Sequence, residues 1–271
     1  ENRTGVDTIS TFAYSYKVDL SEGYPLLTTK KMYFNSMLHE LFWYLSGEEH
    51  IKNLQKNTKI WDAWADEEGR LETAYGRFWR RYPVPEISLD GEVFADENNP
   101  WTTREENGQL VFDQIQYVID TLKELKINPN HKNGRRMIVV AWNPGNATIS
   151  KLPPCHYTFA FNVLGNKLNC HLTQRSGDIA LGIPFNLACY SLLTMMIAKE
   201  CGYEAGEFAH TIIDAHIYEN HIEGLKEQLT REPLKLAKIN IADKPFNELT
   251  FEDITLEDYE SYPAIKFEVA V

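Results

Sequence analysis

The stretch Leu187-Ala-Cys-Tyr-Ser-Leu-Leu-Thr-Met-Met-Ile-Ala-Lys-Glu-Cys201 decides the fold, because it is apolar on nearly every side when it is wound as a helix. Such a pattern is typical of a helix that is buried all round, not of an amphipathic surface helix. Gly202 follows at the position where helices commonly end. We therefore expect residues 187–201 to form a central helix on which the other elements pack.

The segments on both sides of this helix show strand and helix patterns in turn. Residues 157–163 and 167–173 flank Leu164-Gly-Asn166, and the Gly-Asn pair suits the tight turn of a hairpin. Further helices are predicted at 32–46, 113–125 and 216–229, and further strands at 137–142, 234–239, 251–254 and 265–269. This pattern indicates an α+β fold, and a length of 271 residues suits one domain.

Residues 83–107 interrupt this pattern. The stretch is polar and acidic, with Asp90-Gly91 as a turn signal and Pro100 as a breaker. We expect a surface insertion there and assign it no chemistry.

Charge and cysteine content limit the classes of partner. The chain has 27 Lys and Arg against 39 Asp and Glu, a net charge of -12, so its field repels nucleic acid, and an anionic ligand must be small and held by a local arginine cluster. The four cysteines form no Cys-x-x-Cys pair and have no histidine at zinc-site spacing, which predicts no metal site. No apolar run reaches the roughly 18 residues of a membrane span. We expect a soluble cytoplasmic protein with reduced thiols.

The segment Lys151-Leu-Pro-Pro-Cys-His156 carries the first candidate group. The two prolines fix the backbone before Cys155, so a thiol there can be held rigidly at the mouth of the following strand. A lone cysteine is more commonly a small buried hydrophobe. A reactive thiolate needs positive charge or donors nearby, and Arg175 is a candidate source of that charge.

Three arginines are candidates for binding an anion. Arg135 and Arg136 are adjacent where a loop enters an apolar strand, and a phosphate would compensate their charges. Pairing with surface carboxylates would do so equally well. Arg175 favours the phosphate interpretation, because it lies between Gln174 and Ser176 at the end of a predicted strand.

Asn186 lies just before the predicted central helix, so its carboxamide is favoured as an N-cap. A carboxamide also donates and accepts together, which matches the O4 and N3-H groups of uracil. Trp61 and Trp64 fit core packing, although an aromatic pair can also stack on a flat heterocycle.

Asp214, His216 and Tyr218 open the predicted helix 216–229. Residues two apart do not share a helical face, so their side chains converge only if this segment is extended. The structural alternative is an Asp214 cap with His216 in the core.

Taken in order, these segments resemble the thymidylate synthase family over nearly the whole chain. The matching stretches are 2–5, 23–31, 39–43, 60–65, 134–136, 153–156, 174–176, 181–186, 214–218 and the closing Val269-Ala-Val271. The resemblance implies one catalytic domain over 1–271, with a large mixed β-sheet packed with helices and a sheet face forming the interface of a homodimer. It also implies the methylation of dUMP by 5,10-methylenetetrahydrofolate, giving dTMP and dihydrofolate, with no metal, DNA or membrane partner.

The same resemblance assigns roles to residues. Cys155 would add to C6 of the pyrimidine, and Glu40 and Tyr75 would carry proton transfers around C4 and C5. Arg175 and Asn186 complete the catalytic group, Asn186 at the uracil edge. The substrate-binding residues would be Arg3, Arg135, Arg136, His156, Gln174, Ser176, Asp178, Asn186, His216 and Tyr218, with Arg135 and Arg136 contributed by the other subunit. The folate-binding residues would be Lys30, Trp61, Trp64, Asp178, Leu181, Gly182 and Val271.

The chain departs from the usual family pattern at Glu72-Thr73, Phe78, Ala160, Gly177 and Ile213, where the family usually has Gly-Pro, Gln, Gln, Cys and Gly. None of these changes removes a reacting group. Ala160 and Ile213 leave open a hydroxymethyltransferase, acting on dUMP or less readily on dCMP, in which water takes the place of hydride. A third alternative is an inactive nucleotide- or RNA-binding regulator, against which the retained thiol argues.

Overall fold

The computed structural model describes residues 4–85 and 98–269 and confirms the α+β fold. Its contacts divide the chain into two compact units. Unit one comprises Glu1–Leu41 with Phe161–Val271, and unit two comprises Phe42–Ala160. The candidate site residues lie in both units, so each unit is described by itself.

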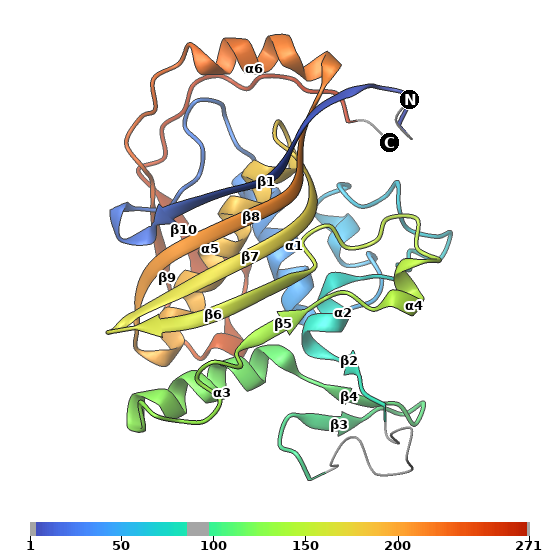
Figure 1. Cartoon of the computed structure of the whole chain (residues 1–271), viewed down its shortest axis with the longest axis vertical. Helices are drawn as coiled ribbons and strands as arrows, with labels where there is room; N and C mark the ends of the chain where they lie inside the picture. The colour runs from blue at the N-terminus through green and yellow to red at the C-terminus, as the bar shows by residue number, and fades with distance from the viewer. Residues whose placement is uncertain (1–3, 86–97, 270–271) are drawn as a thin grey trace. The chain divides into compact units, whose positions relative to one another are not determined.

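A mixed sheet of five strands is the largest element of the fold. Its strands run in the order β1 (Thr8–Asp19), β8 (Glu204–Tyr218), β7 (Lys167–Asp178), β6 (Thr158–Leu164) and β5 (Ile138–Val140). β8 pairs with β1 in antiparallel and with β7 in parallel orientation, and Figure 1 shows β8 between these two neighbours. β6 crosses the boundary between the units, and its first residues pair with β5 in unit two.

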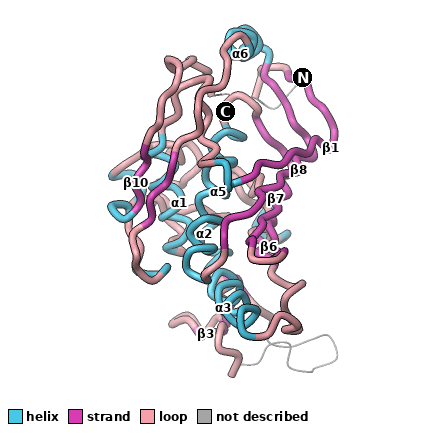
Figure 2. The backbone as a smooth tube through the Cα atoms, turned by 90° about the vertical axis from the view of Figure 1, so that its left-hand side faces the viewer, coloured by secondary structure: helices cyan, strands magenta, loops and turns pink. Residues whose placement is uncertain are grey.

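The predicted central helix is confirmed as α5 (Gly182–Cys201), which packs against β7 and β8 within unit one. Figure 1 and Figure 2 both show it beside these strands. The helix ends at Gly202, which adopts a left-handed conformation with φ of 70°. It begins five residues earlier than predicted, because Pro184 fits the first turn, where no backbone donor is required. Asn186 therefore lies inside the helix, and its predicted role as N-cap is wrong, since Leu181 holds that position.

The prediction of a helix over 216–229 is wrong for its first residues. β8 continues to Tyr218, a 3-10 turn covers Glu219–His221, and only Ile222–Leu229 forms a helix, α6. Pairing with β1 and β7 on both sides satisfies the backbone of β8, and this tertiary context overrides the local pattern. Because β8 is extended there, Asp214 does not cap a helix.

The hairpin is confirmed, with β6 and β7 joined through Gly165 in a left-handed conformation at φ of 61°. Two predicted helices are also confirmed, as α1 (Phe34–Ser46) and α3 (Gln114–Ile127). The strand predicted over 137–142 is present as the shorter β5.

The remaining elements are short. They are the helices α2 (Tyr75–Arg80) and α4 (Pro144–Ala147), the pair β9 (Lys238–Ile241) and β10 (Ile254–Glu257), a three-stranded sheet of β2 (Tyr82–Pro83), β4 (Leu110–Phe112) and β3 (Thr102–Arg104), and 3-10 turns at Leu20–Glu22, Leu54–Lys56, Phe246–Glu248 and Phe251–Asp253.

Three C-terminal strand predictions need correction. The strand expected at 234–239 begins only at Lys238, and the one expected at 251–254 is a 3-10 turn that leads into β10. Residues 265–269 form no strand. Ile265 and Phe267 instead lie against Gly224 of α6, where an added Cβ would be 2.7 Å from the Phe267 ring. Their apolar pattern reflects packing on a helix, not pairing in a sheet.

Part of the predicted insertion at 83–107 is ordered sheet. Residues 86–97 lie outside the described residues, but β3 falls within the stretch and pairs with β4. Trp101, just before β3, is hydrogen-bonded to α3, since its Nε1 donates to Asp120 Oδ2 at 2.8 Å.

Gly76 provides a test of how closely α2 packs against Tyr44 in unit two. An added Cβ would collide with the carbonyl oxygen of Tyr44 and lie 2.9 Å from Tyr44 Cα, so Gly76→Ala should lower the free energy of unfolding by about 2–3 kcal/mol through overpacking. Urea denaturation measures this loss. Gly145→Ala is the matched control, because its Cβ would meet only Asn143 Oδ1 at 3.4 Å. Equal stability of the two variants would contradict the close approach of α2 to Tyr44.

Candidate active site

Cys155 in unit two is half-buried at the end of a loop, and the other three cysteines are buried. Its backbone N-H donates to the hydroxyl of Tyr75 at 2.6 Å, and its Sγ lies 3.9 Å from the carbonyl oxygen of Pro153. Tyr75 is the first residue of α2 and is itself buried. The thiol is thus the accessible one of the four, and its backbone is held by a rigid helix.

Aromatic rings hold Tyr75 and the residue after the cysteine in place. His156 is buried and stacks on Tyr75 with ring centroids 3.9 Å apart and planes 2° from parallel. Tyr44 contacts both rings, at 5.3 Å from Tyr75 and 5.9 Å from His156. The stack restricts both side chains on either side of the Cys155 backbone.

Trp61 belongs to the same aromatic group. It is buried, and its ring centroid lies 5.5 Å from Trp43, 5.8 Å from Trp64 and 5.9 Å from Tyr75. This packing supports the structural interpretation of Trp61. Trp64 is half-buried.

The loop before Cys155 is anchored by Thr73, one of the departures from the family pattern. The Thr73 hydroxyl lies 2.7 Å from Ser150 Oγ and donates to the carbonyl oxygen of Leu152 at 3.0 Å. Thr73 is buried, whereas Glu72 is exposed. A hydrogen-bonded threonine therefore fixes the path of the chain toward the cysteine.

Arg135 and Arg136 are both exposed, and no ion pair between either of them and a carboxylate is recorded in the described part of the chain. The alternative of surface pairing with acidic residues gains no support from these contacts.

In unit one, the neighbouring strands β7 and β8 bring polar residues together. Ser176 is paired with Asp214, and Asp178 with His216. The Ser176 hydroxyl donates to Asp214 Oδ2 at 3.3 Å, which also lies 3.3 Å from His216 Nδ1. Arg175 lies half-buried in β7, within the strand and not at its end as predicted.

The extended conformation of β8 brings its polar side chains to one side, as expected for alternate residues of a strand. The rings of His216 and Tyr218 lie 5.2 Å apart, edge to face. His221, which sequence reasoning missed, continues this group at 5.5 Å from Tyr218. It is fully buried, its Nε2 lies 2.7 Å from the carbonyl oxygen of Glu268, and its place just after the strand gives no local signal.

Asp178 organises the turn that leads into α5. Its Oδ1 accepts from the backbone N-H of Ala180 at 2.8 Å and of Leu181 at 3.4 Å, and lies 3.7 Å from His221 Nδ1. Leu181 and Gly182 are half-buried at this helix start.

Lys30 is attached to the same turn. Its side chain is buried, its Nζ donates to the carbonyl oxygen of Ala180, and it lies 4.7 Å from the ring centroid of Phe267. Burial lowers the pKa of Lys30 to about 8, although the nearby charge of Asp178 acts in the opposite direction. Lys30 is a buried contact of the turn in this structure.

Asn186 is half-buried and ends a row of hydrogen-bonded side chains, because its Oδ1 accepts from Gln174 Nε2 at 3.1 Å and Gln174 in turn contacts His210. Glu40 of α1 is buried as well. Its charge adds to the effect of burial, and together they hold the pKa of Cys189 well above its ordinary value.

Two predicted site residues cannot be placed. Arg3 and Val271 lie outside the described residues. Within the described ranges, no group of three or more His, Cys, Asp or Glu side chains is arranged to hold a metal ion, and no helix there has the length and apolar character to cross a membrane.

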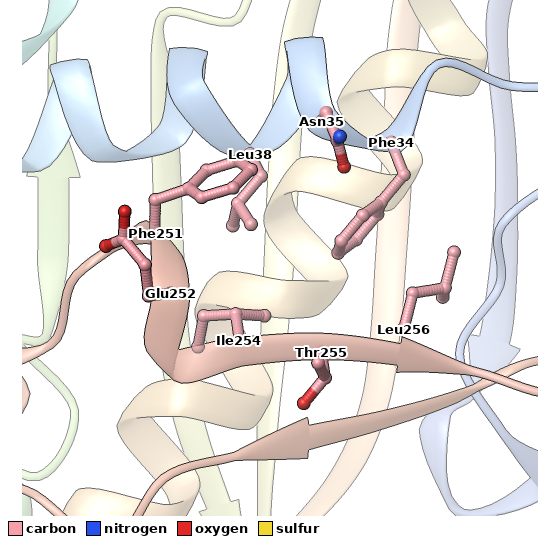
Figure 3. Close-up of a pocket in the computed structure, with 8 residues that line it drawn as sticks. All are labelled: Phe34, Asn35, Leu38, Phe251, Glu252, Ile254, Thr255 and Leu256. Carbon is pink, nitrogen blue, oxygen red and sulfur yellow. The ribbon is translucent and has the colours of Figure 1, made fainter.

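An apolar pocket of about 450 Å³ lies between α1 and the start of β10 in unit one (Figure 3). Phe34 and Leu38 of α1 face Phe251 and Leu256 across it. None of the predicted site residues lines this pocket, so it is distinct from the candidate site.

Comparisons with known proteins show the family of the chain. The sequence model of the thymidylate synthase family matches residues 1–271. A curated thymidylate synthase from Haloferax volcanii is 48% identical over 322 aligned residues, which cover 99% of this chain and 91% of the relative.

The accessibility of the cysteines predicts selective labelling. Iodoacetamide at pH 8 should modify Cys155 at least about tenfold faster than the other thiols, because they are buried and burial raises the pKa of Cys170 to about 12. Peptide mass spectrometry over a time course measures the rates. Labelling in urea is the control, since unfolding should make all four thiols comparable. Equal rates in the native protein would contradict the assigned exposure.

Proposed function

Because the chain belongs to the thymidylate synthase family, we propose that it transfers the one-carbon unit of 5,10-methylenetetrahydrofolate to C5 of dUMP by covalent catalysis at Cys155. The products are dTMP and dihydrofolate. The chain is an enzyme of this family, a methyltransferase of dTMP biosynthesis. The observation that carries the proposal is the half-buried Cys155 thiol on a backbone fixed by Tyr75.

In the proposed reaction the Cys155 thiolate forms a bond to C6 of the pyrimidine, and the displaced electron pair makes C5 enolate-like. C5 then attacks the methylene carbon of the folate. Loss of the C5 proton then breaks the bond between the methylene carbon and the folate nitrogen, which frees tetrahydrofolate and leaves an exocyclic methylene group on C5. Hydride transfer from tetrahydrofolate to this methylene group, with release of the Cys155 thiolate from C6, gives dTMP and dihydrofolate. Tyr75 and Glu40 are proposed to move protons together with ordered water. Both side chains are buried, which favours precise placement.

The nucleotide is proposed to be held by the following charged and polar side chains. Arg3, Arg175, Ser176, Gln174 and His156 would surround the phosphate and base, Asn186 would bind the uracil edge, and His216 and Tyr218 would bind the ribose hydroxyl. Two contacts on β7 and β8 support this proposal: Ser176 bonds to Asp214, and the rings of His216 and Tyr218 lie edge to face. We call these four residues the polar row.

A homodimer is proposed, with Arg135 and Arg136 reaching the phosphate of the partner's nucleotide. Two observations support it. Both arginines are exposed in the single chain, and β1 exposes large apolar side chains, with Ile9 at 59% and Phe12 at 83% exposure. Apolar patches of this kind mark protein interfaces.

The folate is proposed to lie against Trp61 and Trp64, with Asp178, Leu181 and Gly182 lining its site and Val271 closing over it. Lys30 is proposed to attract the glutamate tail, which requires its Nζ to leave the carbonyl oxygen of Ala180. Exclusion of water matters because water can capture the reactive methylene adduct.

We also propose that the two units act as one catalytic domain spanning 1–271, in the cytoplasm, where thiols remain reduced. The single family match over the whole chain supports one domain.

Product analysis tests the reaction. Enzyme with dUMP and 5,10-methylenetetrahydrofolate should give dTMP and dihydrofolate in equal amounts, measured by mass spectrometry and absorbance. Tetrahydrofolate with a 5-hydroxymethyl nucleotide would instead establish the hydroxymethyltransferase. Cys155→Ser should lower kcat by about a thousandfold or more, as loss of a nucleophile does. Cys201→Ser is the control and should retain activity, and unchanged turnover of Cys155→Ser would reject covalent catalysis.

Base selectivity tests the assignment of Asn186. Asn186→Asp replaces a group that donates and accepts by a carboxylate that only accepts, so kcat/KM for dCMP relative to dUMP should rise by about tenfold or more. Parallel assays with both nucleotides measure this ratio. Asn162→Asp, at an exposed position of β6, should leave it unchanged. An unchanged ratio in Asn186→Asp would remove Asn186 from the uracil edge.

A further inference from the structure

Four side chains from four elements of unit one form a continuous chain of hydrogen bonds, with two buried members in the middle and a half-buried residue at each end. The hydroxyl of Tyr16 on β1 lies 2.9 Å from His210 Nδ1 on β8, and His210 Nε2 lies 3.0 Å from Gln174 Oε1 on β7. Gln174 Nε2 then donates to Asn186 Oδ1 on α5. His210 is fully buried, and 3% of Gln174 is exposed. Of these four residues, only Gln174 and Asn186 have roles in the proposed reaction.

One backbone contact fixes which atom donates and which accepts in each hydrogen bond of this series. Gln174 Nε2 lies 3.0 Å from the carbonyl oxygen of Ser176, which can only accept. The atom facing that carbonyl must therefore be the NH2 group of Gln174. The opposite atom, Oε1, is then an acceptor, and it faces His210.

This direction selects one form of His210. Since Gln174 Oε1 only accepts, His210 Nε2 must carry a proton. Burial lowers the pKa of His210 to about 3, with the nearby charge of His171 as a smaller cause, so the ring is neutral and Nδ1 has a lone pair. Burial also raises the pKa of Tyr16 well above its ordinary value, so its hydroxyl keeps its proton and donates to Nδ1.

The last link orients the carboxamide of Asn186. One hydrogen of Gln174 Nε2 goes to Asn186 Oδ1, so the NH2 group of Asn186 must lie on the other side. For Asn186 Nδ2, no acceptor is recorded among the described residues. In this orientation Nδ2 can donate to O4 of uracil, and the second lone pair of Oδ1 can accept from N3-H.

Cytosine presents the opposite pattern, an amino group at C4 and a bare N3. To bind it, the Asn186 carboxamide would have to turn over, which would place its NH2 group against the NH2 group of Gln174. Turning Gln174 as well would break its bond to Ser176 and require the other tautomer of His210. Tyr16 opposes that tautomer by donating to Nδ1.

We propose that Tyr16 and His210 are positioning residues that hold Gln174 and Asn186 in the orientation that accepts uracil and rejects cytosine. The proposal deepens the proposed function and rests on its assignment of Asn186 to the uracil edge. Neither residue touches the nucleotide. They act by making the reversal of the Asn186 carboxamide costly, because reversal leaves buried polar groups unpaired.

Tyr16→Phe is the most direct test, because it removes one hydroxyl and keeps the ring. Without a donor at Nδ1, both tautomers of His210 become available and the amides can turn over. The ratio of the dissociation constants of dCMP and dUMP should fall by about tenfold, mainly through tighter binding of dCMP. Isothermal titration of the full-length protein with each nucleotide measures this ratio. His210→Phe removes both ring nitrogens and should lower the ratio at least as much.

Tyr14→Phe is the matched control. Tyr14 lies on the same strand, its side chain is 51% exposed, and its ring centroid is 6.3 Å from that of Tyr16. It should leave the ratio unchanged. Nitrogen-15 NMR of the histidine rings gives a second measurement, with a proton on His210 Nε2 alone in the wild type and a mixture of tautomers in Tyr16→Phe.

The outcomes separate this proposal from the proposed function. If Asn186→Asp shifts the base preference but Tyr16→Phe matches Tyr14→Phe, the positioning role is overturned and the uracil-edge role stands. A proton on His210 Nδ1 in the wild type overturns it too. If wild type does not bind dUMP more tightly than dCMP, or Asn186→Asp changes nothing, the assignment of Asn186 fails and this proposal fails with it.

Discussion

The pairing of β8 with β1 on one side and β7 on the other is the constraint on which the polar row of unit one depends. Because both edges of β8 are hydrogen-bonded, its backbone stays extended as far as Tyr218. Extension places Asp214, His216 and Tyr218 at alternate positions and brings Asp214 beside Ser176. In a helix the same residues would point in different directions. α5 covers β7 and β8 and supplies Asn186 from its second turn.

Sequence reasoning succeeded where one local signal was strong. The buried helix, the hairpin at Gly165 and the helix predicted at 113–125 each rest on a run of residues whose pattern does not depend on distant partners. It failed at β8, whose conformation is set by two neighbouring strands that are distant in the sequence. The same cause explains the error at residues 265–269. Their apolar side chains pack against Gly224 of α6, and the segment pairs with no strand.

The candidate site was harder to predict from local sequence patterns than the fold. Local arguments favoured an inert Cys155 and an N-cap at Asn186, and the ordered resemblance to a family was needed to give them chemical roles. The structure then supplied contacts that no motif contains, such as the Tyr75 hydroxyl on the Cys155 backbone. His210 could not be found from the sequence, because a single histidine between Ala209 and Thr211 gives no sign of its partners on neighbouring elements.

Two departures from the family pattern have local structural explanations. An added Cβ at Gly177 would collide with Ile183 Cδ1 and lie 3.2 Å from Ile212 Cγ2, so the glycine and its bulky neighbours fill one volume together. At position 73 the family usually has a proline, which restricts the backbone. Thr73 instead makes two hydrogen bonds to the loop before Cys155. These two positions are explained by packing and anchoring, and neither indicates a change in the reaction. Nothing in the structure explains Ile213, which is 37% exposed.

Burying His210 and Gln174 has a physical cost that packing alone does not explain. Each polar group removed from water must find a partner, and a buried hydrogen bond adds only about 1 kcal/mol net once that exchange with water is counted. Apolar side chains of similar volume would satisfy the core between β7, β8 and α5 at no such cost. A fully paired polar chain, in contrast, has a single allowed direction, because reversing any one amide leaves two donors or two acceptors facing each other. The chain from Tyr16 to Asn186 therefore contributes less to stability than to orientation, and orientation is what discrimination between two similar bases requires.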